Sequence, residues 1–388
     1  MPAPPPRSRV TDALPDYDLL VRSPGRINVI GEHTDYTGGL VMPAAIDFSI
    51  WFAVRRTAQP EWRLRALDLG ESAVLPLPVT GRTDRLWVDY LAGVGAQFQD
   101  RGHLLPGLEI AFGGDLPRGS GMSSSAALEG GMAFVLNELL GAGLGRPELA
   151  QLCRRSSNTF IGVPTGIMDQ FASLNGSAEG PIVLNCDTLE FQPVVSHLEG
   201  YRFLLVNSLV THELGSSEYP VRVRECAAAL AAIRERFPAV EALSAATADQ
   251  LAAVAAELPE NVLRRARYVI GENQRVREAV VALERGSPTV LGDLLNATHA
   301  GLRDDFAVSC PEVDLLQATA NEVDGVAGSR IMGGGFGGCT INLVREGAED
   351  ELRARLTRVY SAAYGKTPEF YPVRIRRGTE AVPASPRT

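Results

Sequence analysis

Residues 26 to 39 read RINVIGEHTDYTGG, and this stretch crowds charged and hydrogen-bonding side chains around a short apolar run. Ile27, Val29 and Ile30 indicate a strand, and residues 23 to 25, Ser-Pro-Gly, indicate a turn in front of it. We therefore predict a short strand that leaves the hydrophobic core and presents a polar cluster at its end, as binding sites often do. The side chains that we expect to form this cluster are Arg26, Glu32, His33, Asp35 and Tyr36.

The composition of the chain is that of a folded globular protein. It has 388 residues, of which 45% are hydrophobic and 21% charged, and this length suffices for two domains of ordinary size. The formal net charge of -9 disfavours nucleic acid as the main partner, because phosphate neutralisation needs a clustered basic surface. The five cysteines are widely spaced and predict neither a disulfide framework nor structural zinc. Since we find no apolar leader and no long apolar run, we expect a cytoplasmic protein.

Strand-like and helical runs alternate along the chain, which predicts a mixed α+β fold. The density of glycine-rich motifs falls near residues 190 to 200. We place a domain boundary there, with one domain at 1–195 and a second at 196–388. Residues 1–15 and 380–388 are rich in Pro, Ser and Arg, and we expect them to be loose ends.

A glycine and serine motif at residues 113–134, GGDLPRGSGMSSSAALEGGMAF, predicts a phosphate-binding helix start. Gly119 and Gly121 free the backbone, and three serines then open a helix. A helix N-terminus attracts phosphate through its unpaired N–H groups, and Ser123 to Ser125 add hydroxyl donors. The structural alternative is a glycine loop that only leads into a capped helix. The single lysine, Lys366, is not part of a Walker motif, so nucleotide phosphates would be bound without a Walker lysine.

Two further stretches predict local structure near a ligand. Residues 162–176, GVPTGIMDQFASLNG, predict a short helix in which Thr165 is the cap and Asp169 lies in the first turn. The structural alternative for Asp169 is a role as a helix-terminus stabiliser. Residues 328–344, GSRIMGGGFGGCTINLV, are so dense in glycine that their backbone is expected to pass close to a ligand or to another backbone.

In this order the motifs resemble the GHMP small-molecule kinases, and among them the galactokinase family. The resemblance covers most of the chain, from about residue 20 to 345. It implies two α+β domains, the first like ribosomal protein S5 domain 2 and the second a ferredoxin-like α/β sandwich, with the site in the cleft between them. The matching stretches are SPGRINVIGEHTDYTGG (23–39), LPRGSGMSSSAALE (116–129), GIMDQF (166–171) and GGGFGGCT (333–340).

The resemblance implies ATP-dependent phosphorylation of the anomeric hydroxyl of α-D-galactose to galactose 1-phosphate, the first committed step of galactose catabolism (Leloir pathway). It implies small-molecule partners and a monomer, without nucleic acid or membrane. Asp169 is the implied base, and Arg26 is implied to stabilise negative charge. The implied sugar-binding residues are Glu32, His33, Asp35, Gly166 and Tyr219. The implied ATP-binding residues are Gly119, Gly121, Ser123, Ser124 and Ser125, and Ser125 is also the implied ligand of Mg²⁺.

The chain departs from the family pattern at Ser157, where related kinases usually carry a glutamate that is often regarded as a metal ligand. Mg²⁺ usually keeps several waters and one or two carboxylates. Either Asp169 therefore contributes more here, or the ion is held mainly by ATP and water. Trp87 and Tyr90 remain open between a nucleotide pocket and a half-buried place in the core.

Two other functions also remain open. The first is a kinase of the same family for N-acetylgalactosamine, galacturonate or mevalonate, of which mevalonate fits the sugar-reading cluster poorly. The second is a regulatory sensor that binds galactose and ATP without turnover. Such sensors tend to lose pieces of the phosphate loop, whereas this chain keeps Ser124, Ser125 and Asp169.

Overall fold

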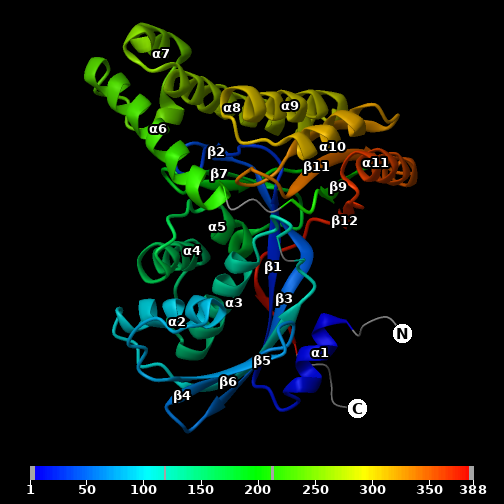
Figure 1. Ribbon diagram of the computed structural model, residues 1–388. Helices are drawn as coiled ribbons and strands as arrows, with labels where there is room; N and C mark the ends of the chain where they lie inside the picture. Colours follow the sequence, from blue (N-terminus) through cyan, green and yellow to red (C-terminus); the bar gives the residue numbers. More distant parts are fainter. Residues whose placement is uncertain (1–4, 118, 211–213, 384–388) are drawn as a thin grey trace.

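The structure of the protein is a computed structural model that describes residues 5–117, 119–210 and 214–383, with the backbone alone at 214–217. Figure 1 shows two layered regions, one above the other, with the long strands β1 (Leu19–Asn28) and β3 (Pro43–Thr57) rising from the lower region toward the upper one. Helices and sheets both build each region, so the α+β prediction is confirmed.

The first sheet has the strand order β13-β1-β3-β6-β4-β5. Its neighbouring strands are antiparallel, except that β4 and β6 run parallel. The strands beside β1 and β3 are β4 (Glu61–Ala66), β5 (Glu71–Pro76), β6 (Gly107–Gly114) and β13 (Glu380–Ala381).

One face of the first sheet is covered by a group of helices that form a large core with it (Figure 1). Strand residues such as Val21, Phe52 and Val54 are buried there against Leu91 and Leu136 of the helices. Removing this apolar surface from water is the main favourable term that holds the helices on the sheet. The helices are α2 (Leu86–Gln99), α3 (Ser124–Leu140), α4 (Arg146–Arg155) and α5 (Met168–Asn175).

The other face of the first sheet carries α1 (Pro6–Ala13), which contradicts the expectation of a loose N-terminus. Val10 and Leu14, which directly follows α1, are buried in one cluster with Leu20 of β1. The expected loose end at 380–388 is also wrong in part, since β13 pairs with β1. Residues 1–4 and 384–388 lie outside the described residues.

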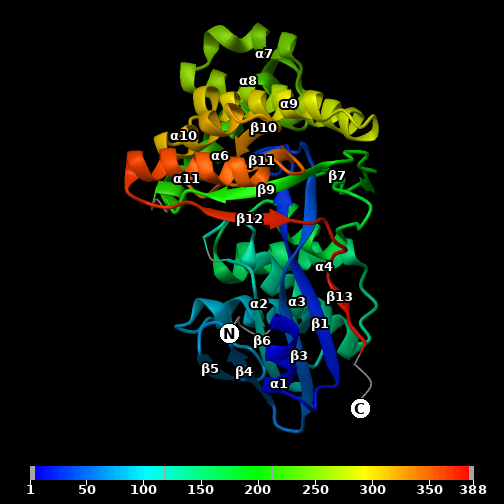
Figure 2. The same ribbon diagram turned by 90° about the vertical axis from the view of Figure 1, so that its right-hand side faces the viewer.

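The second sheet, β10-β11-β9-β12, is antiparallel throughout, and its strands run across those of the first sheet (Figure 2). Successive side chains of a strand point to opposite faces. Leu204 and Val206 accordingly pack with α10 and α11, whereas Phe203 and Leu205 pack with α8 and α9. The elements are β9 (Tyr201–Asn207), β10 (Val326–Ile331), β11 (Cys339–Arg345), β12 (Glu369–Val373), α8 (Glu260–Glu284), α9 (Pro288–Ala300), α10 (Pro311–Asn321) and α11 (Glu349–Tyr364).

The remaining elements lie around these two layers. The helices α6 and α7 flank α8, and the small sheet β2-β7-β8 lies beside the ends of β1 and β3 (Figure 1). No helix within the described residues is long and apolar enough to cross a membrane. These elements are α6 (Leu214–Arg236), α7 (Ala248–Val254), β2 (Leu40–Val41), β7 (Ile182–Asn185), β8 (Phe191–Pro193), the π-helical η1 (Ser156–Ile161) and η4 (Gly301–Asp305), and the 3₁₀ turns η2 (Leu243–Ala245) and η3 (Ala255–Glu257).

Strand β1 confirms the predicted strand but not the predicted turn before it. The Ser-Pro-Gly segment lies inside β1, where the pairing with β3 shifts register between Pro24 and Arg26. A Cβ at Gly25 would lie 2.7 Å from the Met122 carbonyl oxygen, so the backbones pass too closely for a side chain. A bulge of this kind re-aims the following residue without ending the strand, and the residue it re-aims is Arg26.

The end of β1 is embedded in the second region. Ile27, Val29 and Ile30 are fully buried in a cluster with residues of α8, α9 and β11. Polar residues that follow Ile30 are therefore held between the two regions. The C-terminal segment returns to the first region, where Gly378 N donates to Gly176 O at 2.9 Å. The division at 195/196 remains a prediction.

Candidate active site

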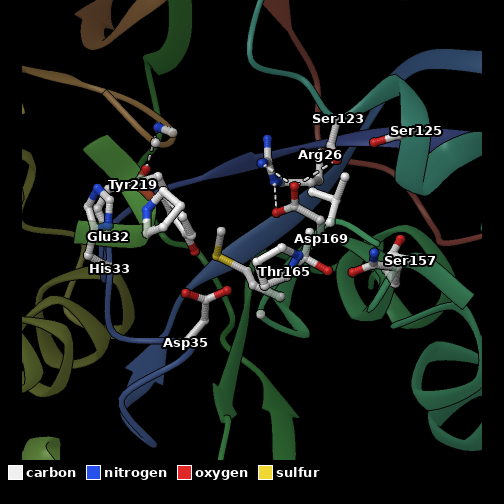
Figure 3. A pocket seen from close by; sticks show the side chains of 18 of the residues that line it. Arg26, Glu32, His33, Asp35, Ser123, Ser125, Ser157, Thr165, Asp169 and Tyr219 are labelled. Carbon is white, nitrogen blue, oxygen red and sulfur yellow. Dashed lines mark hydrogen bonds and ion pairs between the residues drawn. The ribbon is translucent and has the colours of Figure 1, made fainter. Parts of the chain in front are cut away.

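A cavity of about 510 Å³ lies where the end of β1, the starts of α3 and α5, and the glycine-rich loop between β10 and β11 meet. Figure 3 shows that side chains from these distant parts of the sequence face the same space. The predicted site residues that line it are Arg26, Glu32, His33, Asp35, Ser123, Ser125, Gly166, Asp169 and Tyr219.

Asp169 and Arg26 form a two-point ion pair at this cavity (Figure 3). Arg26 Nε donates to Asp169 Oδ1 at 2.7 Å, and Nη2 donates to Oδ2 at 2.6 Å. Burial alone lowers the pKa of Arg26, but the neighbouring Asp169 carboxylate more than offsets this effect, so the pKa is raised. The guanidinium therefore stays charged, and its planar fork fixes the plane of the carboxylate.

Asp169 lies in the first turn of α5, as predicted, but Thr165 is not the cap of that helix. The cap position is Ile167, which has no side chain able to accept a hydrogen bond. The Thr165 amide instead donates to Asn158 Oδ1 at 2.8 Å, which ties this loop back to η1. Capping preference is a local signal, and here a contact between loop and helix overrides it.

Ser123 shares Asp169 Oδ2 with Arg26 as a second donor. Its hydroxyl donates to Asp169 Oδ2 at 2.7 Å, and the role of Ser123 as a donor to phosphate stays a prediction. Ser123 has a φ of 58°, in the left-handed region, directly before α3 begins at Ser124. This conformation is costly for a residue with a Cβ, and it turns the hydroxyl toward Asp169. Gly121, at φ 73°, presents its carbonyl oxygen to Arg26.

Glu32 has protein partners before any ligand arrives. Its Oε1 accepts a hydrogen bond from Arg330 Nη1 at 3.0 Å and another from the Gly333 amide at 2.8 Å. Arg330 is fully buried and also donates to the carbonyl oxygens of Asn28 and Val29. Sequence reasoning missed Arg330, because an arginine near the end of a strand-like run is typical of a surface residue.

Asp35 has no ion pair within the described part of the chain. The pKa of Asp35 is raised to about 7, chiefly by burial and also by the negative charges of Asp169 and Glu32, while Arg26 opposes the shift. The carboxylate lies against the Gly166 backbone, because a Cβ at Gly166 would be 1.6 Å from Asp35 Oδ2. Only glycine fits at position 166 while Asp35 keeps this position.

His33 presents a nitrogen that lacks a hydrogen-bond partner in the described structure. Nδ1 lies 2.9 Å from the Tyr36 hydroxyl, whereas the buried Nε2 atom has no partner there. Burial lowers the pKa of His33 to about 3, with Arg222 adding to the effect. The ring is therefore neutral at pH 7. Tyr219 packs beside it, with ring centroids 5.6 Å apart.

A second cavity of about 800 Å³ adjoins the first, and Tyr90 and Ser125 line both. Trp87 also lines the second cavity, and its indole Nε1 donates to Glu71 at 2.8 Å. Trp87 and Tyr90 therefore face a cavity as well as the core. Ser124 lines the second cavity, so the start of α3 separates the two spaces. The apolar residues lining it are Ile50, Ala66, Leu69, Leu86, Phe112, Leu116 and Leu128.

Ser157 lines the first cavity and forms a hydrogen bond with a glutamate that sequence reasoning missed. Its hydroxyl lies 2.8 Å from each carboxylate oxygen of Glu129, a buried residue one helical turn after Ser125. Burial raises the pKa of Glu129 to about 7, and hydrogen bonds from Ser157 and Gln170 oppose the shift. Glu129 is the one acidic residue in the first three turns of α3, which was the available signal.

The donor groups of this cavity suit a hard cation that arrives with ATP. Among the described residues, no group of three or more His, Cys, Asp or Glu side chains could hold a metal ion by itself. Serine hydroxyl and carboxylate oxygens do line the cavity, at Ser125, Ser157 and Asp169. Mg²⁺ is commonly bound through one or two carboxylates together with water and phosphate oxygens, so the residues fit a cation shared with a nucleotide.

Comparison with known proteins first defines the class. The model of the GHMP kinases N terminal domain matches residues 89–177, and that of the GHMP kinases C terminal matches residues 279–362. A solved mevalonate kinase structure, 18% identical in sequence, has the same fold with a TM-score of 0.68 over 92% of this chain and 99% of that one. The protein is a GHMP kinase with the two-domain fold of that class.

Within this class, the chain belongs to the galactokinase family. The galactokinase galactose-binding signature matches residues 10–56. Galactokinases from Roseiflexus and Clostridium beijerinckii are 38% and 36% identical, over 94% and 95% of this chain and 93% and 95% of theirs. The crystal structure of Lactococcus lactis galactokinase complexed with galactose has a TM-score of 0.91 and 34% identity, over 96% of this chain and 98% of that one.

Proposed function

We propose that this protein transfers the γ-phosphoryl group of ATP to the anomeric hydroxyl of α-D-galactose. The observation that carries the proposal is the pair of adjoining cavities, with the Asp169–Arg26 ion pair in the first and Ser125 lining both. The galactose-bound relative from Lactococcus supports galactose as the sugar.

The sugar would lie in the first cavity, between His33 and the two acidic side chains of the same loop. The unpartnered Nε2 of His33 and the carboxylate of Asp35 are the groups that still need hydrogen bonds. Hydrogen bonds to charged groups contribute about 1.5 to 3 kcal/mol each. A sugar that lacks a matching hydroxyl is rejected because it leaves such a group buried and unpaired. Tyr219 and Gly166 would close the sides of this subsite.

Asp169 would accept the proton of the anomeric hydroxyl, with Arg26 beside the phosphoryl group in transit. Phosphoryl transfer has a loose transition state that depends on positioning and charge stabilisation more than on early deprotonation. The fold supports this division, since Arg26 and Ser123 hold the Asp169 carboxylate in one orientation. Asp169 would then accept the proton late, while Arg26 stabilises the negative charge throughout.

ATP would lie across the start of α3, with its base in the second cavity near Trp87 and Tyr90. The N–H groups at this helix start favour phosphate, and Gly119, Gly121, Ser124 and Ser125 would surround the phosphate chain. Mg²⁺ is the proposed cation, which would neutralise phosphate charge, and Ser125 is its proposed ligand.

We also propose a monomer in the cytoplasm, divided into domains at 195/196. Residues of one chain line both cavities, which supports an active monomer. The five cysteines are buried and free, as in proteins of reducing compartments.

An ADP-release assay with Mg²⁺ and ATP tests the proposal by comparing galactose with glucose, N-acetylgalactosamine and mevalonate. We expect turnover with galactose and at most weak turnover with the others. Turnover that favours N-acetylgalactosamine would assign the other sugar. Binding of galactose and ATP in calorimetry without any turnover would instead favour a sensor.

A further inference from the structure

Glu129 is a buried carboxylate whose role the proposed reaction does not explain. It has no ion pair in the described part of the chain, and its side chain is fully buried on α3. Its partners are Ser157, at 2.8 Å from both carboxylate oxygens, and more distantly Gln170 Nε2 at 3.4 Å. Burying a carboxylate without a cation is costly, so this arrangement points to a positive charge that none of the described residues supplies.

The cavity wall in front of Glu129 is made of oxygen-bearing side chains. Ser157 and Gln170 line the same cavity as Ser125 and Asp169. Gln170 is buried, and its Oε1 atom, a hydrogen-bond acceptor, has no partner among the described residues. Ser125 and Glu129 are four residues apart on α3, which places them on one face of that helix.

The hydrogen bond between Ser157 and Glu129 also sets the direction of the serine lone pairs. When Glu129 is ionised it can only accept, so Ser157 then donates its proton to Glu129, and the Oγ lone pairs of Ser157 are free to bind a group in the cavity. A buried carboxylate behind a ligand makes that ligand more basic and fixes its orientation. A hard divalent cation prefers oxygen ligands of this kind.

We propose that Ser157 and Glu129 act as one unit that binds the divalent cation of ATP. Ser157 Oγ faces the ion, and Glu129 supplies the negative charge one hydrogen bond behind it, where the family pattern leads one to expect a glutamate at position 157 itself. The inference rests on the proposed function, because the cation arrives with the nucleotide. Ser157 is a second ligand of the cation beside Ser125, and Glu129 is the positioning residue.

Binding of Mn²⁺ to the full-length protein with ADP, measured from the electron paramagnetic resonance signal of free Mn²⁺, tests this unit without any turnover. We expect Ser157→Ala and Glu129→Gln each to weaken Mn²⁺ binding by about tenfold or more. The double variant should bind Mn²⁺ no more weakly than the single variant with the larger loss. The reason is that the effects of substituting two residues that act as a unit do not add. Glu322→Gln, at an exposed glutamate paired with Arg355, is the matched control and should bind Mn²⁺ as the unmodified protein does.

Calorimetric binding of galactose without metal separates a folding defect from a metal defect. We expect galactose affinity to be unchanged in both single variants. Unchanged Mn²⁺ affinity in Ser157→Ala would overturn the inference, whatever Glu129→Gln does, and additive losses in the double variant would overturn the idea of one unit. If the unmodified protein failed to bind Mn²⁺ with ADP at all, the proposed function would fail as well, and this result is distinct from the other two.

Discussion

The two ends of the first cavity differ in how completely the protein pairs the carboxylate found there. At the phosphoryl end, Asp169 accepts hydrogen bonds from Arg26 and Ser123 before any ligand binds. At the sugar end, Asp35 has no ion pair in the part of the chain that the structure describes, and burial raises its pKa to about 7. The fold therefore fixes the group that takes part in transfer, and it leaves incompletely paired the group that reads hydroxyls. The unpaired end lowers stability in exchange for selectivity.

The largest effect is expected from removing the charge of Asp169. Asp169→Asn should fold normally and lose about 10² to 10⁴ in turnover, since it removes the proton acceptor while keeping the shape. Single-turnover measurements give the loss, and calorimetry with galactose and ATP is the control for binding. Near-normal turnover in a clean preparation would show that Asp169 is not the base.

Removing Arg26 should act on the same end of the cavity. Arg26→Ala should lower turnover by about 10² to 10³, in the range found for a lost charge-stabilising donor. It should raise the Michaelis constant for galactose much less, because the guanidinium pairs with Asp169 and not with the sugar cluster. Steady-state kinetics separate the two parameters, and a defect confined to the Michaelis constant would mean that Arg26 only orders the substrate.

Asp35→Asn tests the sugar end of the cavity. It should weaken galactose binding while raising the stability of the folded protein. The loss of a hydrogen bond to a charged group predicts galactose binding about 10 to 100 times weaker by calorimetry. Because the pKa of Asp35 is raised in the folded protein, wild-type stability falls as the pH rises from 3.8 to about 7. The variant should therefore gain more in melting temperature at pH 8 than at pH 5. An equal gain at both values would contradict a buried, raised carboxyl group.

Ser123→Ala is expected to have the smallest effect on turnover, and it tests whether Ser123 acts through Asp169. It removes one of the donors to Asp169, and turnover should fall by about tenfold with galactose affinity unchanged. Steady-state kinetics, which separate turnover from the Michaelis constants of galactose and ATP, are the readout that distinguishes this role from a merely structural one. If the loss appeared only in the Michaelis constant for ATP, Ser123 would be a phosphate ligand as the sequence first suggested.

The sequence predicted the parts of the site that depend on local pattern. The apolar run before Glu32 indicated a strand end, and the glycine and serine run indicated the start of α3, with Gly119 and Gly121 at positive φ. That Arg26 and Asp169 meet across 143 positions came from the family resemblance and not from periodicity.

The parts that were missed depend on tertiary contacts. In the sequence, Glu129 is typical of an exposed glutamate on a helix. In the structure, it is buried, and Ser157 of η1 forms a hydrogen bond with it. In the sequence, Arg330 is typical of a surface residue at a strand end. In the structure, it is buried and forms hydrogen bonds with the end of β1 and with Glu32. The misread turn at residues 23–25 has the same cause, because a bulge in a paired strand and a free turn use the same residue types.

The most direct test of the central claim is to identify the product by phosphorus nuclear magnetic resonance after incubation with galactose, ATP and Mg²⁺. We expect loss of the γ-phosphate signal of ATP and the appearance of one phosphomonoester, coupled to the anomeric proton of α-galactose. A phosphate on another hydroxyl would contradict the placement of Asp169. Unchanged ATP, with both ligands bound, would contradict the kinase function itself.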